Sequence, residues 1–305
     1  MRIVIIGQAA FGKKVLEALT ERGEEIVGVY TSPDIPRKTN PLKELAVQLG
    51  IPTFQPREMR APEVYTEYIK LKPDLNVMAY VTSIIPENIL NYPKLGTIQY
   101  HPALLPKHRG GSAINWAIIN GETKTGITIF WPDRGIDTGP ILLQREVEIS
   151  PDDTVGSLYF DKLFPLGIEA LVESSELIKK GIAPRIPQDE SQATYEGLCT
   201  EKDAVINWLQ PVTRVYNLIR GTNPQPGAIT QFRGKQLELF DAELLVGGVG
   251  RSPGEVINIT KEGFTVAAMN GAILVKRVQV ENTPKIAAAE FAEQVDLKVG
   301  DRLGE

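Results

Sequence analysis

The chain opens with RIVIIGQAAFGKKVLEALTERGEEIVGVYT, which spans residues 2–31. Residues 2–7 form an apolar run rich in β-branched side chains, residues 12–21 have apolar positions at helical spacing, and residues 25–31 are strand-like again. This β-α-β order predicts two neighbouring parallel strands joined by a right-handed crossover. It therefore indicates an α/β fold.

The same alternation continues beyond the opening stretch. Strand-like runs are expected at residues 75–80, 97–101 and 126–131, and helices at residues 41–49 and 63–71. A long, mostly helical segment at residues 154–180 is expected to break at Pro165. We therefore predict a Rossmann-like, mostly parallel sheet with helices between its strands.

The periodicity changes after a proline-rich connector at residues 181–188. A short helix is expected at residues 212–220, and strand-like runs follow at residues 237–245, 255–259, 264–268 and 273–280. We predict two domains: an α/β catalytic domain over residues 1–203, and a small, OB-like β-barrel over residues 206–305.

The composition is that of a globular protein. Of 305 residues, 42% are hydrophobic and 23% are charged, and the formal net charge is -5. The single cysteine, Cys199, excludes an internal disulfide and a cysteine metal cluster. The opening apolar run is too short for a signal peptide and no later run reaches transmembrane length, so we expect a cytoplasmic protein with no membrane partner.

Both histidines of the chain lie in QYHPALLPKHRGG, residues 99–111. His101 ends a strand-like run, so it should stand at the carboxyl edge of the sheet, where open α/β sheets bind ligands. Residues 103–106 offer an apolar ledge for a flat heteroaromatic ring, and Arg109 offers a cation in a flexible glycine loop. We expect His108 to be solvated, because loops lie on the surface.

A second reactive group follows the next strand, in DRGIDTG, residues 133–139. Asp137 lies between two glycine-containing turns, where an Asx-turn is the alternative to a chemical role. A carboxylate beside an imidazole in a cleft can share protons with a substrate amine. Asp133 carries the same charge in the same loop, and spacing alone does not choose between the two.

Two other kinds of site are disfavoured by the sequence. The turn GQAAFG, residues 7–12, stands where a dinucleotide fingerprint belongs but lacks its middle glycine. We therefore expect no NAD, and a nicotinamide oxidoreductase is the weakest alternative. Two histidines and no cysteine pair give no zinc or iron spacing, and the carboxylates form no calcium loop, so we expect no metal.

Together, QYHPALLPKHRG at residues 99–110 and DRGIDTG at residues 133–139 resemble the folate-dependent formyltransferases. The resemblance covers nearly the whole chain, from residues 5–12 to ATYEG at residues 193–197. It looks closest to the amino-terminal formyl-hydrolase domain of 10-formyltetrahydrofolate dehydrogenase, and next closest to methionyl-tRNA formyltransferase. It implies that residues 1–203 bind 10-formyltetrahydrofolate as the formyl donor.

The resemblance also implies roles for individual residues. The Asn, His and Asp trio of the family corresponds to Gln99, His101 and Asp137, with Gln99 providing a longer amide. The amide and the imidazole would stabilise a tetrahedral oxyanion, and Asp137 would orient His101 and accept a proton from the nucleophile. The residues implied to bind the folate are Ser83, Ile84, Ile85, Ala103, Leu104, Leu105, Pro106 and Asp137.

The sequence leaves the formyl acceptor open. From Ile206 onward, eleven Lys and Arg balance eleven Asp and Glu, whereas a domain that docks tRNA should be positive. Transfer to water or to a small amine is therefore favoured, and tRNA is a disfavoured partner. The alternatives are a methionyl-tRNA formyltransferase and a non-catalytic folate-binding module. The oligomeric state has no signature in the sequence.

Overall fold

The computed structural model describes residues 1–248 and 250–304 and divides into two compact units. The first unit comprises Met1–Gly111, Gly126–Val147 and Asp161–Glu196. The second comprises Ser112–Thr125, Glu148–Phe160 and Gly197–Glu305. Two earlier stretches of the chain thus belong to the second unit. The domain boundary expected between residues 203 and 206 stays a prediction.

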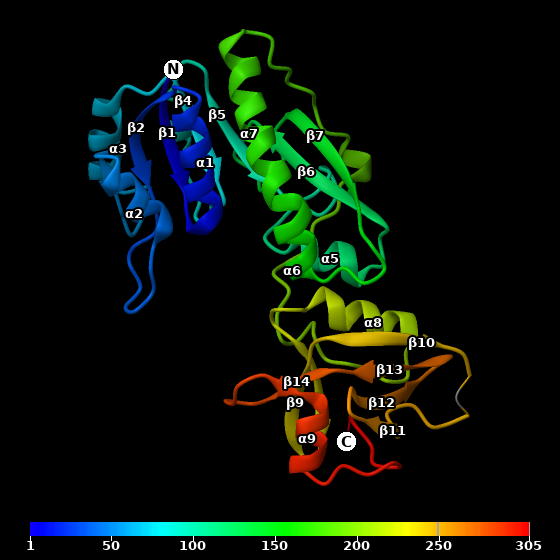
Figure 1. The fold of residues 1–305 in the computed structure, drawn as a ribbon. Coiled ribbons are helices and arrows are strands. Elements are labelled where there is room, and N and C mark those ends of the chain that lie inside the picture. The colour runs from blue at the N-terminus through cyan, green and yellow to red at the C-terminus, as the bar shows by residue number, and fades with distance from the viewer. Residues whose placement is uncertain (249, 305) are drawn as a thin grey trace. The chain divides into compact units, whose positions relative to one another are not determined.

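A seven-stranded sheet forms the centre of the first unit, in the order β3-β2-β1-β4-β5-β6-β7 (Figure 1). Its strands are β1 (Arg2–Gly7), β2 (Glu25–Tyr30), β3 (Thr53–Phe54), β4 (Leu75–Ala79), β5 (Thr97–His101), β6 (Lys124–Phe130) and β7 (Ile141–Glu148). The neighbouring pairs from β3 to β5 are parallel, and β6 runs antiparallel to β5. The predicted mostly parallel sheet is confirmed.

Helices cover both faces of this sheet, which explains the continuous apolar runs of its inner strands. The helices of the first unit are α1 (Ala9–Glu21), α2 (Pro41–Gln48), α3 (Pro62–Tyr68), α4 (Glu87–Leu90) and α7 (Phe164–Lys179), with 3-10 turns at Ile69–Leu71 and Glu190–Gln192. Val4 of β1 shares a core cluster with Tyr68 of α3. On the other face, α1 packs against α7, where the rings of Phe11 and Phe164 meet edge to face.

The long helical segment predicted at residues 154–180 consists of three parts. It begins with α6 (Val155–Ser157) behind a capping box at Thr154, continues as a π-helical turn over Leu158–Leu163, and ends with α7. Pro165 lies in the first turn of α7, where a missing N–H removes no helical hydrogen bond. The helix is therefore interrupted just before the proline.

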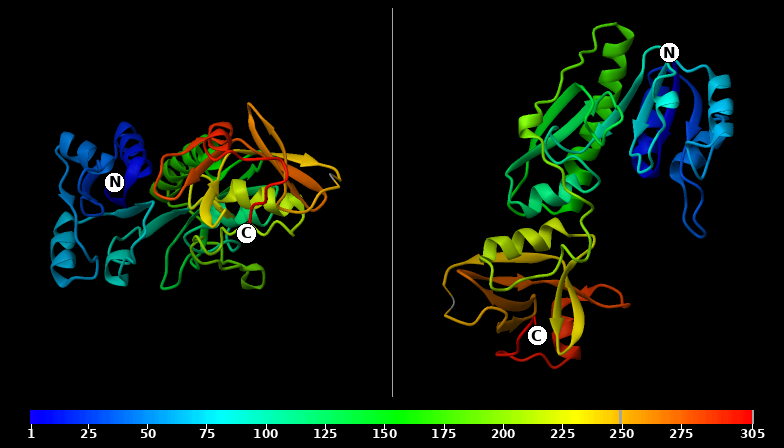
Figure 2. Two further views of the ribbon diagram at one scale, coloured as in Figure 1. Left: turned by 90° about the horizontal axis from the view of Figure 1, so that it is seen from below. Right: turned by 180° about the vertical axis from the view of Figure 1, so that it is seen from behind.

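The second unit contains two four-stranded antiparallel sheets, in the orders β10-β13-β12-β11 and β15-β14-β9-β8. Their strands are coloured from yellow to red in Figure 2. Its strands are β8 (Ala228–Phe232), β9 (Lys235–Leu239), β10 (Ala242–Val246), β11 (Val256–Thr260), β12 (Gly263–Ala268), β13 (Gly271–Val275), β14 (Arg277–Val280) and β15 (Ile286–Ala287). Its helices include α5 (Ala113–Ile119), α6, α8 (Val212–Gly221) and α9 (Ala288–Gln294). This arrangement is consistent with the expected small barrel-like domain.

Two runs predicted as single strands are each divided in the structure. Residues 237–245 form β9 and β10, and residues 273–280 form β13 and β14, because the chain passes from one sheet to the other within each run. Main-chain hydrogen bonds join the two crossing points, and one of them runs from Phe240 N–H to Arg277 O at 3.0 Å. Apolar periodicity is unbroken across these bends, so the sequence alone does not mark them.

Candidate active site

The structure brings His101 and Asp137 together. His101 is the last residue of β5, and Asp137 lies in the loop of residues 131–140 that joins β6 to β7. The imidazole Nδ1 stands 3.5 Å from Oδ2 of Asp137, and the two side chains are only 5% and 9% exposed. The carboxyl end of a parallel strand is where α/β sheets collect ligands and reactive groups.

The surrounding main chain fixes the protons on this pair. His101 Nε2 donates to the carbonyl of His108 at 2.8 Å, because a carbonyl oxygen can only accept. The neutral imidazole therefore presents the lone pair of Nδ1 to the carboxylate of Asp137. Neither Nδ1 of His101 nor Oδ2 of Asp137 then carries a proton, so the two atoms do not hydrogen-bond. Their separation of 3.5 Å is accordingly longer than that of a hydrogen bond. The pair has room for one proton.

Burial and charge act on the His101 imidazole in opposite directions. Burial lowers its pKa from the ordinary value of 6.5, whereas the charge of Asp137 and the carbonyl of His108 raise it, and burial prevails. The imidazole is therefore neutral at pH 7, which is the form that accepts a proton.

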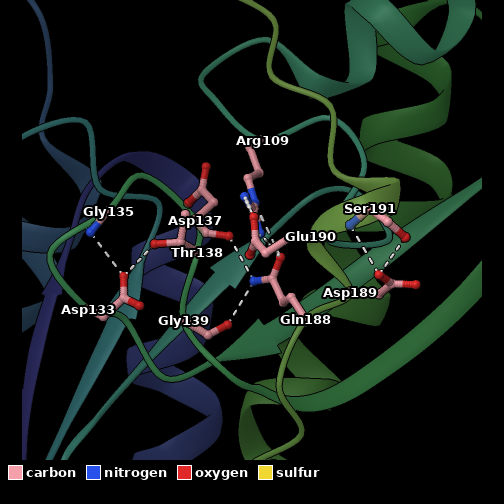
Figure 3. Close-up of polar contacts among 10 residues, drawn as sticks. All are labelled: Arg109, Asp133, Gly135, Asp137, Thr138, Gly139, Gln188, Asp189, Glu190 and Ser191. Atoms are coloured by element: carbon pink, nitrogen blue, oxygen red, sulfur yellow. Dashed lines mark hydrogen bonds and ion pairs between the residues drawn. The ribbon is translucent and has the colours of Figure 1, made fainter.

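The loop that carries Asp137 has an unusual backbone conformation. Asp137 has a φ of 57°, in the left-handed region that few residues other than glycine, asparagine and aspartate adopt, and Gly110 N–H donates to its Oδ2 at 2.9 Å. Asp133, the other carboxylate of the loop, is exposed and accepts hydrogen bonds from Gly135 N–H and the Thr138 hydroxyl (Figure 3). The Asx-turn considered for Asp137 is therefore made by Asp133.

Gln99 precedes His101 by two positions on β5, so the two side chains project from the same face of the sheet. Gln99 is half-buried, and its amide makes no hydrogen bond to any residue in the ranges 1–248 and 250–304. This amide is therefore available to a ligand at the edge where His101 stands.

Two expectations about the histidine-containing loop are wrong. His108, expected to be solvated, is 4% exposed. Arg109, expected to be a cation in a flexible loop, is 7% exposed and forms a two-point ion pair with Glu190. The cause is a later part of the chain, residues 188–196, which runs back over this loop: Arg109 N–H donates to Thr194 O at 3.0 Å.

The apolar ledge at residues 103–106 is a rigid part of the core. The Thr128 hydroxyl donates to Ala103 O at 2.6 Å and accepts from Leu105 N–H at 3.1 Å. Ala103 and Leu105 are buried, and the other two members of the ledge are half-buried. Only part of the expected apolar surface is therefore open to a ligand.

A cavity of about 420 Å³ opens at the carboxyl ends of β1, β2 and β4. Ser83 and Ile84, two of the residues expected to bind the folate, line it, whereas Ile85 is buried and the ledge at residues 103–106 does not reach it. Its wall also includes Arg57 and Arg60, neither of which has an ion-pair partner in the part of the chain that the structure describes. Glu58 also lines the cavity, so its wall carries a net charge of about +1, which favours a ligand with an anionic group.

The described residues contain no group of three or more His, Cys, Asp or Glu side chains that could hold a metal ion. Burial raises the pKa of the Cys199 thiol to about 11, so it is not a thiolate at neutral pH. None of the described helices is both long enough and apolar enough to cross a membrane.

Gly139, in the Asp137 loop, has no room for a side chain. A Cβ at this position would lie 1.8 Å from Trp131 O, a main-chain atom. We expect Gly139→Ala to lower the free energy of unfolding by about 1–3 kcal/mol, the usual effect of overpacking, as measured by chemical denaturation. Gly197→Ala is the matched control, because nothing lies within 4 Å of a Cβ there. Equal denaturation midpoints in the two variants would contradict the clash.

The fold and the site define the class of protein. A mostly parallel seven-stranded sheet with a buried imidazole–carboxylate pair at its edge, followed by antiparallel sheets, is the framework of an α/β enzyme. Residues 1–173 match the family described as formyl transferase, and residues 199–295 match the formyl transferase C-terminal domain. The chain therefore belongs to the formyl transferase family, which confirms the resemblance read from the sequence.

Two kinds of relative match the chain over nearly all of its length. Cytosolic 10-formyltetrahydrofolate dehydrogenase of Mus musculus is 42% identical over 306 residues, which cover 95% of this chain and 34% of the mouse protein. Methionyl-tRNA formyltransferase of Geobacter sulfurreducens is 38% identical over 311 residues, which cover 100% of this chain and 97% of that protein. The chain thus spans about a third of the dehydrogenase.

Solved structures share the fold. HypX from Aquifex aeolicus, in complex with tetrahydrofolic acid, superposes with a TM-score of 0.72 at 21% identity, over 99% of this chain and 48% of that chain. An N-formyltransferase from Helicobacter canadensis, in complex with folinic acid and dTDP-3-aminofucose, gives a TM-score of 0.71 at 19% identity, over 90% of this chain and 98% of that chain. The formyltransferase fold expected from the sequence is confirmed.

Proposed function

We propose that this protein removes the formyl group from 10-formyltetrahydrofolate and passes it to water or to a small amine. The observation that carries the proposal is the buried pair of His101 and Asp137, whose facing acceptor atoms stand 3.5 Å apart. A nucleophile that attacks a formyl carbon must lose a proton as it forms the new bond. This pair supplies the base that takes it.

In the proposed reaction, the proton that the nucleophile loses is finally transferred to the folate nitrogen. As the nucleophile bonds to the formyl carbon, its proton moves between His101 Nδ1 and Asp137 Oδ2, and the formyl oxygen becomes an oxyanion. Gln99 donates its unused amide N–H to this oxyanion. The oxyanion then collapses, the bond from carbon to the folate nitrogen breaks, and that nitrogen takes the proton from the pair. Water yields formate and a released proton, and an amine yields a formamide.

We propose a folate as the formyl donor. The complexes of HypX with tetrahydrofolic acid and of the Helicobacter enzyme with folinic acid support a folate ligand for this fold. Of the residues expected to bind the donor, Ser83, Ile84, Leu104 and Pro106 are proposed to contact it, with Asp137 at its formyl end. Ile85, Ala103 and Leu105 are buried and are proposed to support that surface. The cavity lined by Arg57 and Arg60 suits carboxylate groups such as those of a folate tail.

Water or a small amine is proposed as the acceptor because the charge of the later part of the chain is balanced. From Ile206 onward there are eleven basic and eleven acidic residues, whereas a surface that binds nucleic acid carries a positive excess. Methionyl-tRNA formyltransferase is the second candidate, since the chain matches such an enzyme over 97% of that enzyme's length.

An assay with different acceptors tests these functions. The purified protein is incubated with 10-formyltetrahydrofolate alone, with a panel of small amines, and with charged initiator tRNA, and tetrahydrofolate and formate are quantified. We expect both products to form without an added acceptor. Formylated methionyl-tRNA would instead support the second candidate. Folate binding in calorimetry without any turnover would overturn the catalytic proposal and identify a folate-binding module.

A further inference from the structure

Gln188 links the loop of Asp137 to the loop of Arg109. Its Nε2 donates to the main-chain carbonyls of Asp137 at 2.8 Å and of Gly139 at 2.7 Å (Figure 3). Its Oε1 accepts from Arg109 Nε at 3.2 Å and from Nη2 at 2.8 Å. These contacts occupy both donors and both lone pairs of the amide.

Glutamine is suited to this position by its chemistry. A guanidinium only donates and a carbonyl only accepts, so the partners of Gln188 fix which way its amide points. A glutamate would still pair with Arg109, but it would set a carboxylate against the carbonyls of Asp137 and Gly139. A half-buried carboxylate that faces two carbonyl oxygens is destabilised, so the loop would have to move.

Arg109 is fixed by an ion pair, and the main chain on either side of it contacts His101 and Asp137. Its guanidinium meets Glu190 at 2.7 and 2.9 Å. The carbonyl of the preceding residue, His108, accepts from His101, and the N–H of the following residue, Gly110, donates to the carboxylate of Asp137. The chain around Arg109 thus holds the imidazole and the carboxylate, while Gln188 connects Arg109 to the backbone of the residue that bears the carboxylate.

We propose that Gln188 is a positioning residue that holds Asp137 at its place opposite His101 for the formyl transfer. This inference rests on the proposed function. The left-handed backbone of Asp137 persists only where its surroundings impose it, and Gln188 bonds to the carbonyl of that residue. Gln188 acts through Asp137, so it affects the chemical step more than the binding of the donor.

The substitution Gln188→Glu tests the proposal, with Gln192→Glu as the matched control. Gln192→Glu adds the same charge on the same segment. The amide that it replaces is exposed and donates to Asp189, not to the Asp137 loop. We expect Gln188→Glu to lower kcat by about 10²-fold, the loss that a misplacement of about 1 Å causes, with little change in KM. Gln192→Glu should keep the kcat of the unmodified protein. The shorter amide of Gln188→Asn should lower kcat in the same direction.

A second measurement does not depend on turnover. The chain has only two histidines, so proton NMR can follow each imidazole, with His108→Asn assigning the signals. In Gln188→Asn, which adds no charge, a displaced Asp137 raises the pKa of His101 less, so that pKa should fall, whereas in Gln192→Asn it should stay unchanged. An unmodified protein without turnover would contradict the proposed function, and the titration would still test Gln188.

Two results would overturn the role of Gln188. One is that Gln188→Glu and Gln188→Asn keep both the kcat and the His101 titration of the unmodified protein. The other is a loss of kcat that equals the loss of folded protein in thermal unfolding, with an unchanged titration. That second result would make Gln188 a purely structural residue.

Discussion

Replacing His101 by asparagine is expected to lower the turnover of 10-formyltetrahydrofolate by about 10²- to 10⁴-fold, the range that a general base contributes. Asparagine is shorter than histidine, so it also loses the contact that His101 Nε2 makes with the carbonyl of His108 at 2.8 Å. It has no basic nitrogen to face Asp137, so the proton of the nucleophile has no place between the two side chains. Steady-state kinetics at saturating donor measures the loss, and thermal unfolding checks that the fold persists.

His108 provides the matched comparison for that variant. Both histidines are 4% exposed, so a general effect of losing a buried imidazole would appear in either case. His108→Asn keeps the main-chain carbonyl that holds His101, and asparagine tolerates the φ of 54° at this position. We expect a far smaller loss of turnover than in His101→Asn. Equal losses would contradict the assignment of the base to His101.

The inner strands of the sheet could be predicted because both of their faces are covered. All residues of β4 are buried, and so are all but the first of β1, which leaves continuous apolar runs in the sequence. The edge strands carry no such signal. β3 has only two residues, and β7 has two buried residues at its start followed by exposed charged side chains such as Arg145. Neither strand has a clear period, so neither could be predicted.

His101 and Asp137 could be singled out from the sequence, but their surroundings could not be predicted. Each follows a strand-like run, yet β6 runs antiparallel to β5, so it is the loop of residues 131–140 that brings Asp137 back to His101. The burial of Arg109 comes from Gln188, which lies 79 residues later in a proline-rich connector. A contact across that separation leaves no local pattern, and glutamine in a connector looks like any exposed polar residue. The sequence therefore predicted a flexible cation where the structure has a fixed one.

Asp137→Asn is expected to lower turnover by about 10²- to 10⁴-fold while leaving the fold intact. Asparagine accepts the left-handed backbone of this position, and its side-chain oxygen can still accept the Gly110 N–H that now contacts Asp137 at 2.9 Å. What the variant lacks is a carboxylate that shares a proton with His101. Asp133→Asn is the matched control, because Asp133 is exposed in the same loop, and it should keep the rate of the unmodified protein.

The pH profile separates the charge of Asp137 from its geometry. Burial lowers the pKa of His101 below 6.5 and the charge of Asp137 raises it, so removing that charge lowers the pKa further. A reaction that needs the neutral imidazole slows as the pH falls through this pKa. The acid limb of kcat/KM therefore lies below about 6.5 in the unmodified protein, and at lower pH still in Asp137→Asn. If that limb stays in place, the carboxylate does not act on the imidazole, and His101 takes the proton without sharing it.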